Sequence, residues 1–409
     1  MTTSLSSLRL ALAGTGLGLI LALAGPAAFA ADKQPEQNKD EAVRPEVGKP
    51  LTEAQDAIKA KNWDLALSKL GEADAAKDKT PYETYAIDRT RGVAASGKGD
   101  QATAAKAFSA AIETGKMKPE DQLNMMAVVT SLYGQAKDYA NATAWGQRYL
   151  KAGGTDAQVK TIIVQAEYLS GDYASAARDA QAQIAATEQA GQKPTEAQYT
   201  LLASAYLKQN NDAGYVSVLE QFVVAYPSKE RWADLISHVD HKPGFDNRLL
   251  LDVNRLQRAT GSLSANCAAM VELDLQDGVS SEAKSVAEDS ACSVPKALQA
   301  KAAAAAAEDR KKLDRDAKDA EGFKDGNVLV TIGYTFVGFG EHQKGIAALE
   351  QGIGKGGLKH PDEAKLMLGI AYFQAGQYPK AIDTFNAIKG GNGAADLAHL
   401  WALRAKQGA

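Results

Sequence analysis

The histidine-containing segment near residue 240 has side chains whose types and spacing could bind a metal. His238, Asp240 and His241 lie within four consecutive positions, and imidazole and carboxylate groups are ordinary zinc ligands. A further ligand at a fixed spacing is missing, and the segment continues into Lys242-Pro243-Gly244, which is typical of a turn. We therefore interpret the segment as the end of a helix and predict no metal and no cofactor.

Two glycine- and lysine-rich stretches invite comparison with phosphate-binding loops. They are Ser96-Gly97-Lys98-Gly99 and Gly354-Lys355-Gly356-Gly357. A phosphate-binding loop needs a preceding strand and a Gly-Lys-Ser/Thr sequence that opens a helix, and neither stretch has a Ser or Thr after its lysine. No Gly-x-Ser-x-Gly motif occurs, and the many carboxylate pairs have the spacing of exposed helical faces. The sequence therefore predicts that the protein is not an enzyme.

The composition excludes several further classes of protein. The chain has 409 residues, with 46 Lys and Arg against 50 Asp and Glu and a net charge of −4. Nucleic-acid-binding proteins usually present a basic surface, so we predict no nucleic-acid partner. Two cysteines are too few for a disulfide-rich scaffold or a cysteine-based zinc module.

The first thirty residues have the pattern of a secretory signal peptide. Arg9 precedes the apolar run Leu10–Leu23, and small residues at Ala28 and Ala30 precede Ala31, as a signal peptidase requires. The alternative is a membrane anchor, but the run is shorter than the roughly 20 residues that span a bilayer. We predict cleavage between Ala30 and Ala31, export to the periplasm, and no stable membrane insertion afterwards.

A pattern of mostly small residues recurs along the chain at spacings of 34 to 39 residues, with two longer gaps of 68 and 62 residues. The segment Ile332-Gly333-Tyr334-Thr335-Phe336 is repeated 36 positions later as Leu368-Gly369-Ile370-Ala371-Tyr372, and each copy continues through a glycine-containing turn to a second apolar segment. This pattern resembles the tetratricopeptide repeat, a helix–turn–helix of 34 residues. In that family, small residues at repeat positions 8 and 20 let the two helices touch. The residues that fall at position 20 are Ala66, Ala104, Ala142, Ala176, Tyr215, Ala283, Gly345 and Ala381.

The resemblance implies an all-α solenoid of antiparallel hairpins. Residues 31–50 are polar and proline-containing, and they are expected to form a flexible linker. Repeats are expected in an N-terminal block over residues 51–228, in degenerate hairpins over residues 229–296, and in a C-terminal pair within residues 326–409. Residues 297–325 are alanine-rich and charged, and they predict one long helix, either a spacer or a partner-binding helix. Residues 394–406 are expected to form a helix that caps the open end of the array.

The resemblance also bears on the two cysteines. Cys267 and Cys292 fall near the start of the first helix and the end of the second helix of one repeat. Antiparallel helices bring such ends together, and an oxidising compartment favours a disulfide. Two buried free thiols are the alternative, because the second cysteine lies about one turn too far along.

The resemblance implies a protein-binding groove lined by the first helices of the repeats. We therefore expect a scaffold that binds an envelope protein or peptide. The segment from Arg231 to Leu256 also resembles secreted repeat proteins of Gram-negative bacteria, which suggests an assembly such as a TonB-type energy-transducing system. The alternative is a carrier or chaperone for peptides, glycans or outer-membrane substrates. The groove residues, carried over by repeat position, are Arg89, Asn124, Ser131, Gln135, Gln158, Thr161, Gln165, Tyr168, Thr200, Ser204, Lys208, Asn327, Tyr334, Phe373 and Gln374.

Overall fold

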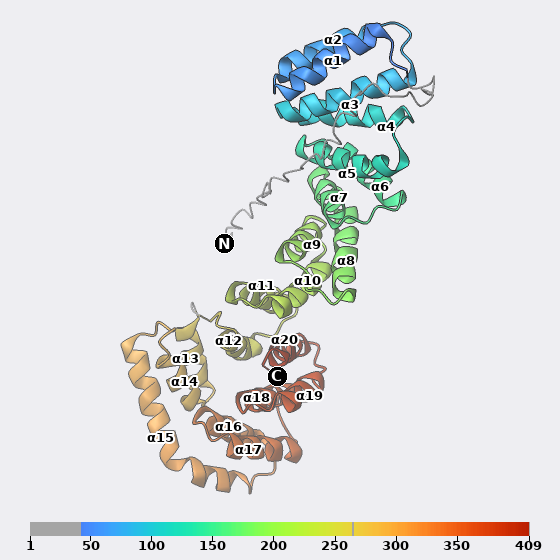
Figure 1. Ribbon diagram of the computed structural model, residues 1–409. Helices are drawn as coiled ribbons and strands as arrows, with labels where there is room; N and C mark the ends of the chain where they lie inside the picture. The colour runs from blue at the N-terminus through green and yellow to red at the C-terminus, as the bar shows by residue number, and fades with distance from the viewer. Residues whose placement is uncertain (1–41, 264–265, 409) are drawn as a thin grey trace. The chain divides into compact units, whose positions relative to one another are not determined.

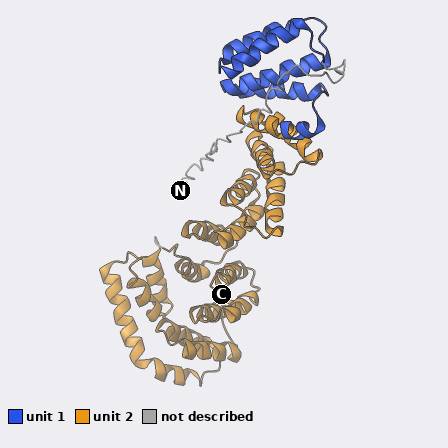
Figure 2. Cartoon of the chain, viewed as in Figure 1, with its two compact units in different colours: residues 1–125 blue, residues 126–409 orange. Residues whose placement is uncertain are grey.

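The computed structural model describes residues 42–263 and 266–408, and every regular element within these ranges is helical (Figure 1). The predicted signal peptide and its cleavage site at Ala30 and Ala31 lie outside the described residues. Among the residues that are described, no helix combines the length and the apolar character needed to cross a membrane. The chain divides into two compact units, residues 1–125 and 126–409 (Figure 2).

The first unit contains two consecutive helical hairpins and the start of a third. Its helices meet through small residues: a Cβ atom on Gly92 would lie 2.5 Å from the ring of Phe108 on the partner helix. With Ala104 at repeat position 20, Gly92 falls at position 8, where the resemblance implies a small residue. The elements are α1 (Pro45–Lys59), α2 (Trp63–Asp74), α3 (Pro81–Lys98), α4 (Gln101–Glu113) and α5 (Pro119–Gln135).

The end of the predicted linker is part of the first hairpin. Helix α1 begins at Pro45, so residues 45–50 are helical rather than flexible, and Val47 is fully buried. Just before the helix, the Arg44 side chain forms an ion pair of 2.9 Å with the buried Glu83 of α3. Glu83 also completes a capping box with Thr80 at the start of α3. One apolar side chain and one ion pair therefore order a segment whose composition is mostly polar.

The second unit continues the hairpins. Its early second helices begin at an Asp or Asn whose side chain caps the helix: Asp138 accepts from the Asn141 backbone N–H (3.3 Å), and Asp172 from that of Ser175 (3.1 Å). The elements are α6 (Tyr139–Lys151), α7 (Ala157–Ser170), α8 (Tyr173–Gln189), α9 (Glu196–Lys208), α10 (Asp212–Ala225), α11 (Lys229–Asp240), η2 (Asn247–Leu249), α12 (Leu250–Ala259), α13 (Cys267–Gln276), α14 (Ser280–Ala287), α15 (Lys296–Ala320), α16 (Asn327–Gly338), α17 (His342–Lys355), α18 (Pro361–Gln374), α19 (Tyr378–Asn386) and α20 (Ala394–Lys406).

Helix α15 is the predicted long helix. It has 25 residues and buries Ala302, Ala306 and Leu313 along one side, while most of its charged residues remain exposed. The helix packs against α13, α14 and α16. It therefore connects the degenerate hairpins to the C-terminal repeat pair through its own apolar stripe.

Helix α20 does more than cap the last repeat. It packs against α18 and α19, as expected, and also against α11 and α12 (Figure 1). Helices α12 to α20 thus form a closed circuit of packed neighbours, which we call the ring. The predicted capping helix is thus present, and it also packs against α11 and α12, which together we call the degenerate hairpin.

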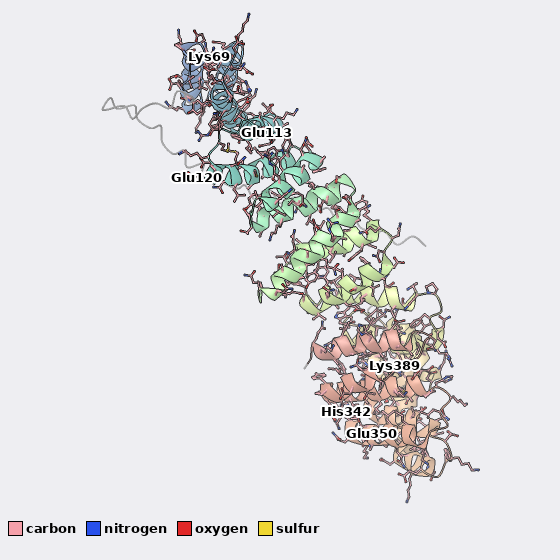
Figure 3. All side chains as sticks on the ribbon, turned by 90° about the vertical axis from the view of Figure 1, so that its right-hand side faces the viewer. Lys69, Glu113, Glu120, His342, Glu350 and Lys389 are labelled. Carbon is pink, nitrogen blue, oxygen red and sulfur yellow. A yellow bond between two sulfur atoms is a disulfide. The ribbon has the colours of Figure 1, made fainter. Side chains whose placement is uncertain are left out.

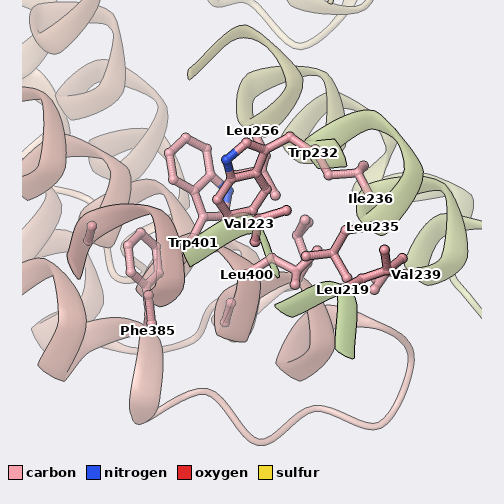
Figure 4. Packing of buried hydrophobic residues seen from close by; sticks show 14 of the residues in the cluster. Leu219, Val223, Trp232, Leu235, Ile236, Val239, Leu256, Phe385, Leu400 and Trp401 are labelled. Atoms are coloured by element: carbon pink, nitrogen blue, oxygen red, sulfur yellow. The ribbon is translucent and has the colours of Figure 1, made fainter. Parts of the chain in front are cut away.

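The ring is closed by a shared core and by long-range hydrogen bonds. Trp401 of α20 is buried and lies near Val223, Trp232 and Leu256 (Figure 4). Three polar contacts join the C-terminal residues to the degenerate hairpin and to α10. The Arg404 side chain donates to the Ala259 carbonyl (3.0 Å), the Gln407 amide to the Val223 carbonyl (2.6 Å), and the Lys242 Nζ lies 2.9 Å from Asp396.

Cys267 and Cys292 form a disulfide in the structure, with their Cα atoms 5.6 Å apart. Cys267 is the first residue of α13, and Cys292 lies in the turn that follows α14. The bond therefore closes the open end of the α13–α14 hairpin, as the repeat positions implied.

Candidate partner-binding surface

The expected groove residues of α7 and α9 lie on accessible faces of these first helices. Gln158 and Lys208 are exposed, and the remaining members are partly exposed. The hydroxyls of Thr161 and Ser204 donate to backbone carbonyls of their own helices, at 2.9 and 2.7 Å. The surface is therefore polar but almost uncharged, with hydroxyl and amide groups as its main hydrogen-bonding groups. The partly exposed members are Thr161, Gln165, Tyr168, Thr200 and Ser204.

Two exposed leucines on the same helices were missed by the sequence analysis. The side chains of Leu169 and Leu207 are 39% and 41% exposed. Leu169 follows Tyr168 directly and holds repeat position 13, and Leu207 precedes Lys208 and holds position 12. Both positions line the groove in the family. Taking both of these positions in each repeat, rather than one, would have found them. They add apolar contact area to a polar surface.

The remaining groove residues of α3 and α5 are also accessible. Arg89 and Asn124 are exposed in the first unit, whereas Gln135 is exposed and Ser131 partly exposed in the second. The Gln135 amide donates to the Ser131 hydroxyl (3.0 Å). Nothing in these environments distinguishes the four residues from ordinary solvated helix surface.

The C-terminal groove residues do not form an open surface. Tyr334 is 1% exposed, so the prediction that it lines a groove is wrong. Asn327 is occupied by local structure, because its side chain donates to the Gly357 carbonyl (3.1 Å) and accepts from the Lys359 backbone N–H (3.0 Å). Phe373 packs edge-on against Trp401, with ring centroids 5.5 Å apart. Gln374 alone of this group is exposed.

Tyr334 is buried because a charged cluster covers it. The Arg255 guanidinium lies 4.4 Å from its ring, and the Tyr334 hydroxyl donates to Glu282 (3.3 Å). Arg255 also contacts Asp252 at 2.7 Å and Glu282 at 2.8 Å, and its Nη2 lies 3.8 Å from Asp274. Burial and the neighbouring Glu282 raise the pKa of Asp274 to about 10, so this carboxyl holds a proton at neutral pH. A position that is surface in an open repeat array becomes core inside the ring.

The histidine segment shows no metal-binding arrangement. His238 lies on α11 with its Nε2 3.6 Å from Asp234, and its ring packs edge-on against Tyr215. His241 contacts Asp240, its neighbour in the chain, at the end of the helix. Within residues 42–263 and 266–408, no group of three or more His, Cys, Asp or Glu side chains could hold a metal ion.

Many carboxylates on the outer faces form ion pairs with lysine or arginine. Lys69, labelled in Figure 3, lies between Glu53 and Glu72 at 2.9 and 3.0 Å. Lys344 similarly contacts Asp314 and Glu341 at 2.9 and 2.8 Å. These arrangements are networks of surface ion pairs, with no geometry that would position an acid and a base around a substrate.

A cavity of about 460 Å³ lies among α6, α7, α8 and the start of α9. Its wall is mainly apolar, with Leu150, Ile163 and Val164 on one side and alanines of α8 on the other. Asp179 also lines it. Asp179 interacts with Glu167 of α7, which is 3% exposed. Burial and the Asp179 charge raise the pKa of Glu167 to about 7.

Comparison with known proteins identifies one segment of the chain. Residues 363–390, which cover most of α18 and all of α19, match a family model described as tetratricopeptide repeat. One solved structure, of Naa15/Naa10 bound to HypK-THB, aligns over 86% of this chain and 70% of that chain, with 14% identity and a TM-score of 0.25. This likeness is too distant to carry an argument. No curated protein matches the sequence.

Proposed function

Because residues 363–390 match the tetratricopeptide-repeat model, we propose that the chain is a non-catalytic scaffold that binds a protein partner on the first helices of its repeats. The observation that carries the proposal is the surface of α7 and α9. There, Leu169 and Leu207 are exposed at groove positions among uncharged hydroxyl and amide side chains. Such a surface offers apolar contacts together with hydrogen-bonding groups for a polypeptide backbone.

We further propose that the scaffold acts in the periplasm, within an envelope assembly such as a TonB-type energy-transducing system. The signal-like sequence of residues 1–30 supports export. The Cys267–Cys292 disulfide supports an oxidising compartment, since disulfides are rare in reducing ones. The resemblance of the segment from Arg231 to Leu256 to secreted repeat proteins supports the envelope assembly.

A second candidate function is that of a carrier or chaperone for small or extended ligands. The cavity among α6 to α9 favours it, because about 460 Å³ is within the usual range for a ligand pocket. A carrier would bind many ligands weakly, whereas a scaffold would hold a few partners in fixed ratio.

In-cell crosslinking of the full chain, followed by mass spectrometry, distinguishes the two functions. The test variant carries Gln165→Glu, Leu169→Ser and Leu207→Ser, which alter the exposed surface of α7 and α9 and leave the core intact. The matched control is Leu65→Ser, because Leu65 is 44% exposed but lies on α2, a second helix. We expect a few partners in stoichiometric yield that are lost from the triple variant and retained by the control.

A broad set of weakly captured proteins that is unchanged in the triple variant would contradict the scaffold. That result would favour a carrier, and a variant that narrows the cavity, Ala186→Leu, would then be expected to reduce capture.

A further inference from the structure

The α13–α14 hairpin makes the polar connections on one side of the ring. Ser280 donates to Asp309 of α15 (2.6 Å), and Ser281 donates to the Thr335 carbonyl of α16 (2.9 Å). Arg258 of α12 donates to the Ser285 hydroxyl (2.8 Å). One short hairpin is thus hydrogen-bonded to the helices before and after it, so its position fixes how α12 and α16 meet.

The same hairpin supplies the charged partner that Arg255 requires. Arg255 of α12 is 3% exposed and pairs with Glu282 of α14 at 2.8 Å, whereas the carboxyl of Asp274 on α13 lies 3.8 Å away. Tyr334 of α16 completes the cluster by donating to Glu282 (3.3 Å). A buried guanidinium that loses such partners is strongly destabilising. Displacement of the hairpin would therefore disturb both α12 and α16.

The hairpin is short, and apolar contacts also join it to its neighbours. Helices α13 and α14 have 10 and 8 residues, and their apolar cluster includes Leu251 of α12 and Ala302 of α15. Val279, between the two helices, belongs to the main core of the second unit. The disulfide joins the start of α13 to the turn after α14, across 25 positions of sequence. Closing a loop of this length restricts the unfolded hairpin substantially. The covalent bond therefore adds to these contacts a restraint that keeps the two ends of the hairpin together.

We propose that the Cys267–Cys292 disulfide is a redox-sensitive latch, whose reduction releases the α13–α14 hairpin from α12 and α16 and opens the ring. The two sulfurs differ in access, because Cys267 is 1% exposed and Cys292 is partly exposed in its turn. A dithiol reductant would attack the Cys292 sulfur.

The exchange balances as an ordinary two-electron reduction. Attack by one thiolate of the dithiol forms a mixed disulfide at Cys292 and expels the Cys267 thiolate, which takes up a proton. The second thiolate of the reductant then attacks the reductant sulfur that is bonded to Cys292. This closes the cyclic disulfide and expels the Cys292 thiolate, which is also protonated. The products are two cysteine thiols and the oxidised, cyclic form of the dithiol.

Hydrogen exchange of the full-length protein, before and after treatment with dithiothreitol, tests the latch. Maleimide labelling of both cysteines first establishes that the bond has been reduced in the folded protein. We expect exchange in residues 267–292 to become about a hundredfold faster. We also expect exchange in α12 and α16 to become about tenfold faster, because they share the Arg255 cluster. Peptides from α7 to α9 serve as the internal control and should not change.

The double variant Cys267→Ser, Cys292→Ser should reproduce the exchange pattern of the reduced wild type without any reductant. If this variant does not fold, the reduced wild-type protein alone decides the question. Faster exchange confined to residues 267–292, with α12 and α16 unchanged, would overturn the latch and leave a purely local brace. Failure of dithiothreitol to reduce the bond in the folded protein would overturn it as well.

Discussion

At the residue scale, single side chains decide where the folded chain begins and which positions are surface. Arg44 and Val47 draw a polar N-terminal segment into the first hairpin through Glu83. Arg255 turns Tyr334 from a groove residue into a core residue. Both effects depend on a buried charged side chain that forms an ion pair. The spacing of apolar residues in the sequence does not reveal such pairs.

Glu83 provides a test at this scale. The Arg44 side chain, together with backbone donors at Arg44 and Thr80, lowers the pKa of Glu83 from 4.5 to about 2. Its contribution to stability is therefore complete above pH 4.5 and is lost as the pH falls toward about 2. We expect Glu83→Gln to cost about 2 kcal/mol at neutral pH, and the difference from wild type to shrink below pH 4.5. Hydrogen exchange of α1 and α3 as a function of pH measures both.

The control is Glu72→Gln, in the same unit. Glu72 is exposed and pairs with Lys69, and exposed ion pairs contribute at most about 1 kcal/mol. Equal losses in the two variants would show that burial of Glu83 is not what gives the pair its strength.

At the element scale, the hairpins follow from repeated pairs of small and large residues. A Cβ on Gly369 would lie 2.4 Å from the Phe385 ring, and one on Gly333 would lie 2.9 Å from the Gly345 carbonyl oxygen. These contacts occur at the positions where the sequence pattern placed small residues. The same pattern could not show that α20 covers the degenerate hairpin, because that contact joins segments far apart in the chain. The burial of Tyr334 and the helical conformation of residues 45–50 could not be predicted for the same reason. Both depend on partners that lie far away in the sequence.

Two glycines test the packing of α16 against α17. Gly333→Ala should destabilise the C-terminal repeats by about 1–3 kcal/mol, because two of the three nearest atoms, at 2.9 Å, are backbone atoms of Gly345 and Leu349 that cannot move aside. Gly354→Ala is the matched substitution on α17, where nothing lies within 4 Å of the added carbon. It should be neutral or stabilise by up to about 1 kcal/mol. Urea-induced unfolding, monitored by hydrogen exchange in α16 to α18, compares them; similar behaviour of the two variants would refute the close approach.

At the scale of the second unit, the ring differs from an open repeat array. In an open array each repeat contacts only its neighbours, so damage remains local. Here α20 packs against α11 and α12, Arg404 of α20 donates to the last residue of α12, and Gln407 just after α20 donates to Val223 of α10. A change at the C-terminus should therefore be detected more than a hundred positions earlier in the chain.

Trp401→Ala tests this coupling. Trp401 is 1% exposed and stacks on Phe385 with ring centroids 5.8 Å apart, so its loss should cost about 3–5 kcal/mol. We expect faster hydrogen exchange in α11 and α12 as well as in α18 to α20. Trp145→Ala is the control, since Trp145 lies on α6 and is only partly buried; it should leave α11 and α12 unchanged. A response limited to α18–α20 would show that the ring is not cooperative.

Closure by α20 also affects the order in which the chain can fold. The hydrogen bonds from Arg404 to Ala259 and from Gln407 to Val223 span 145 and 184 positions. During synthesis from the N-terminus, the first hairpins find all their partners early, because their contacts are local. The apolar face of α11 and α12 stays uncovered until α20 has been synthesised. Intermediates that expose such a face are prone to aggregate. A chain truncated before residue 394 would therefore be left with an uncovered face, which makes this protein dependent on the completion of its final helix.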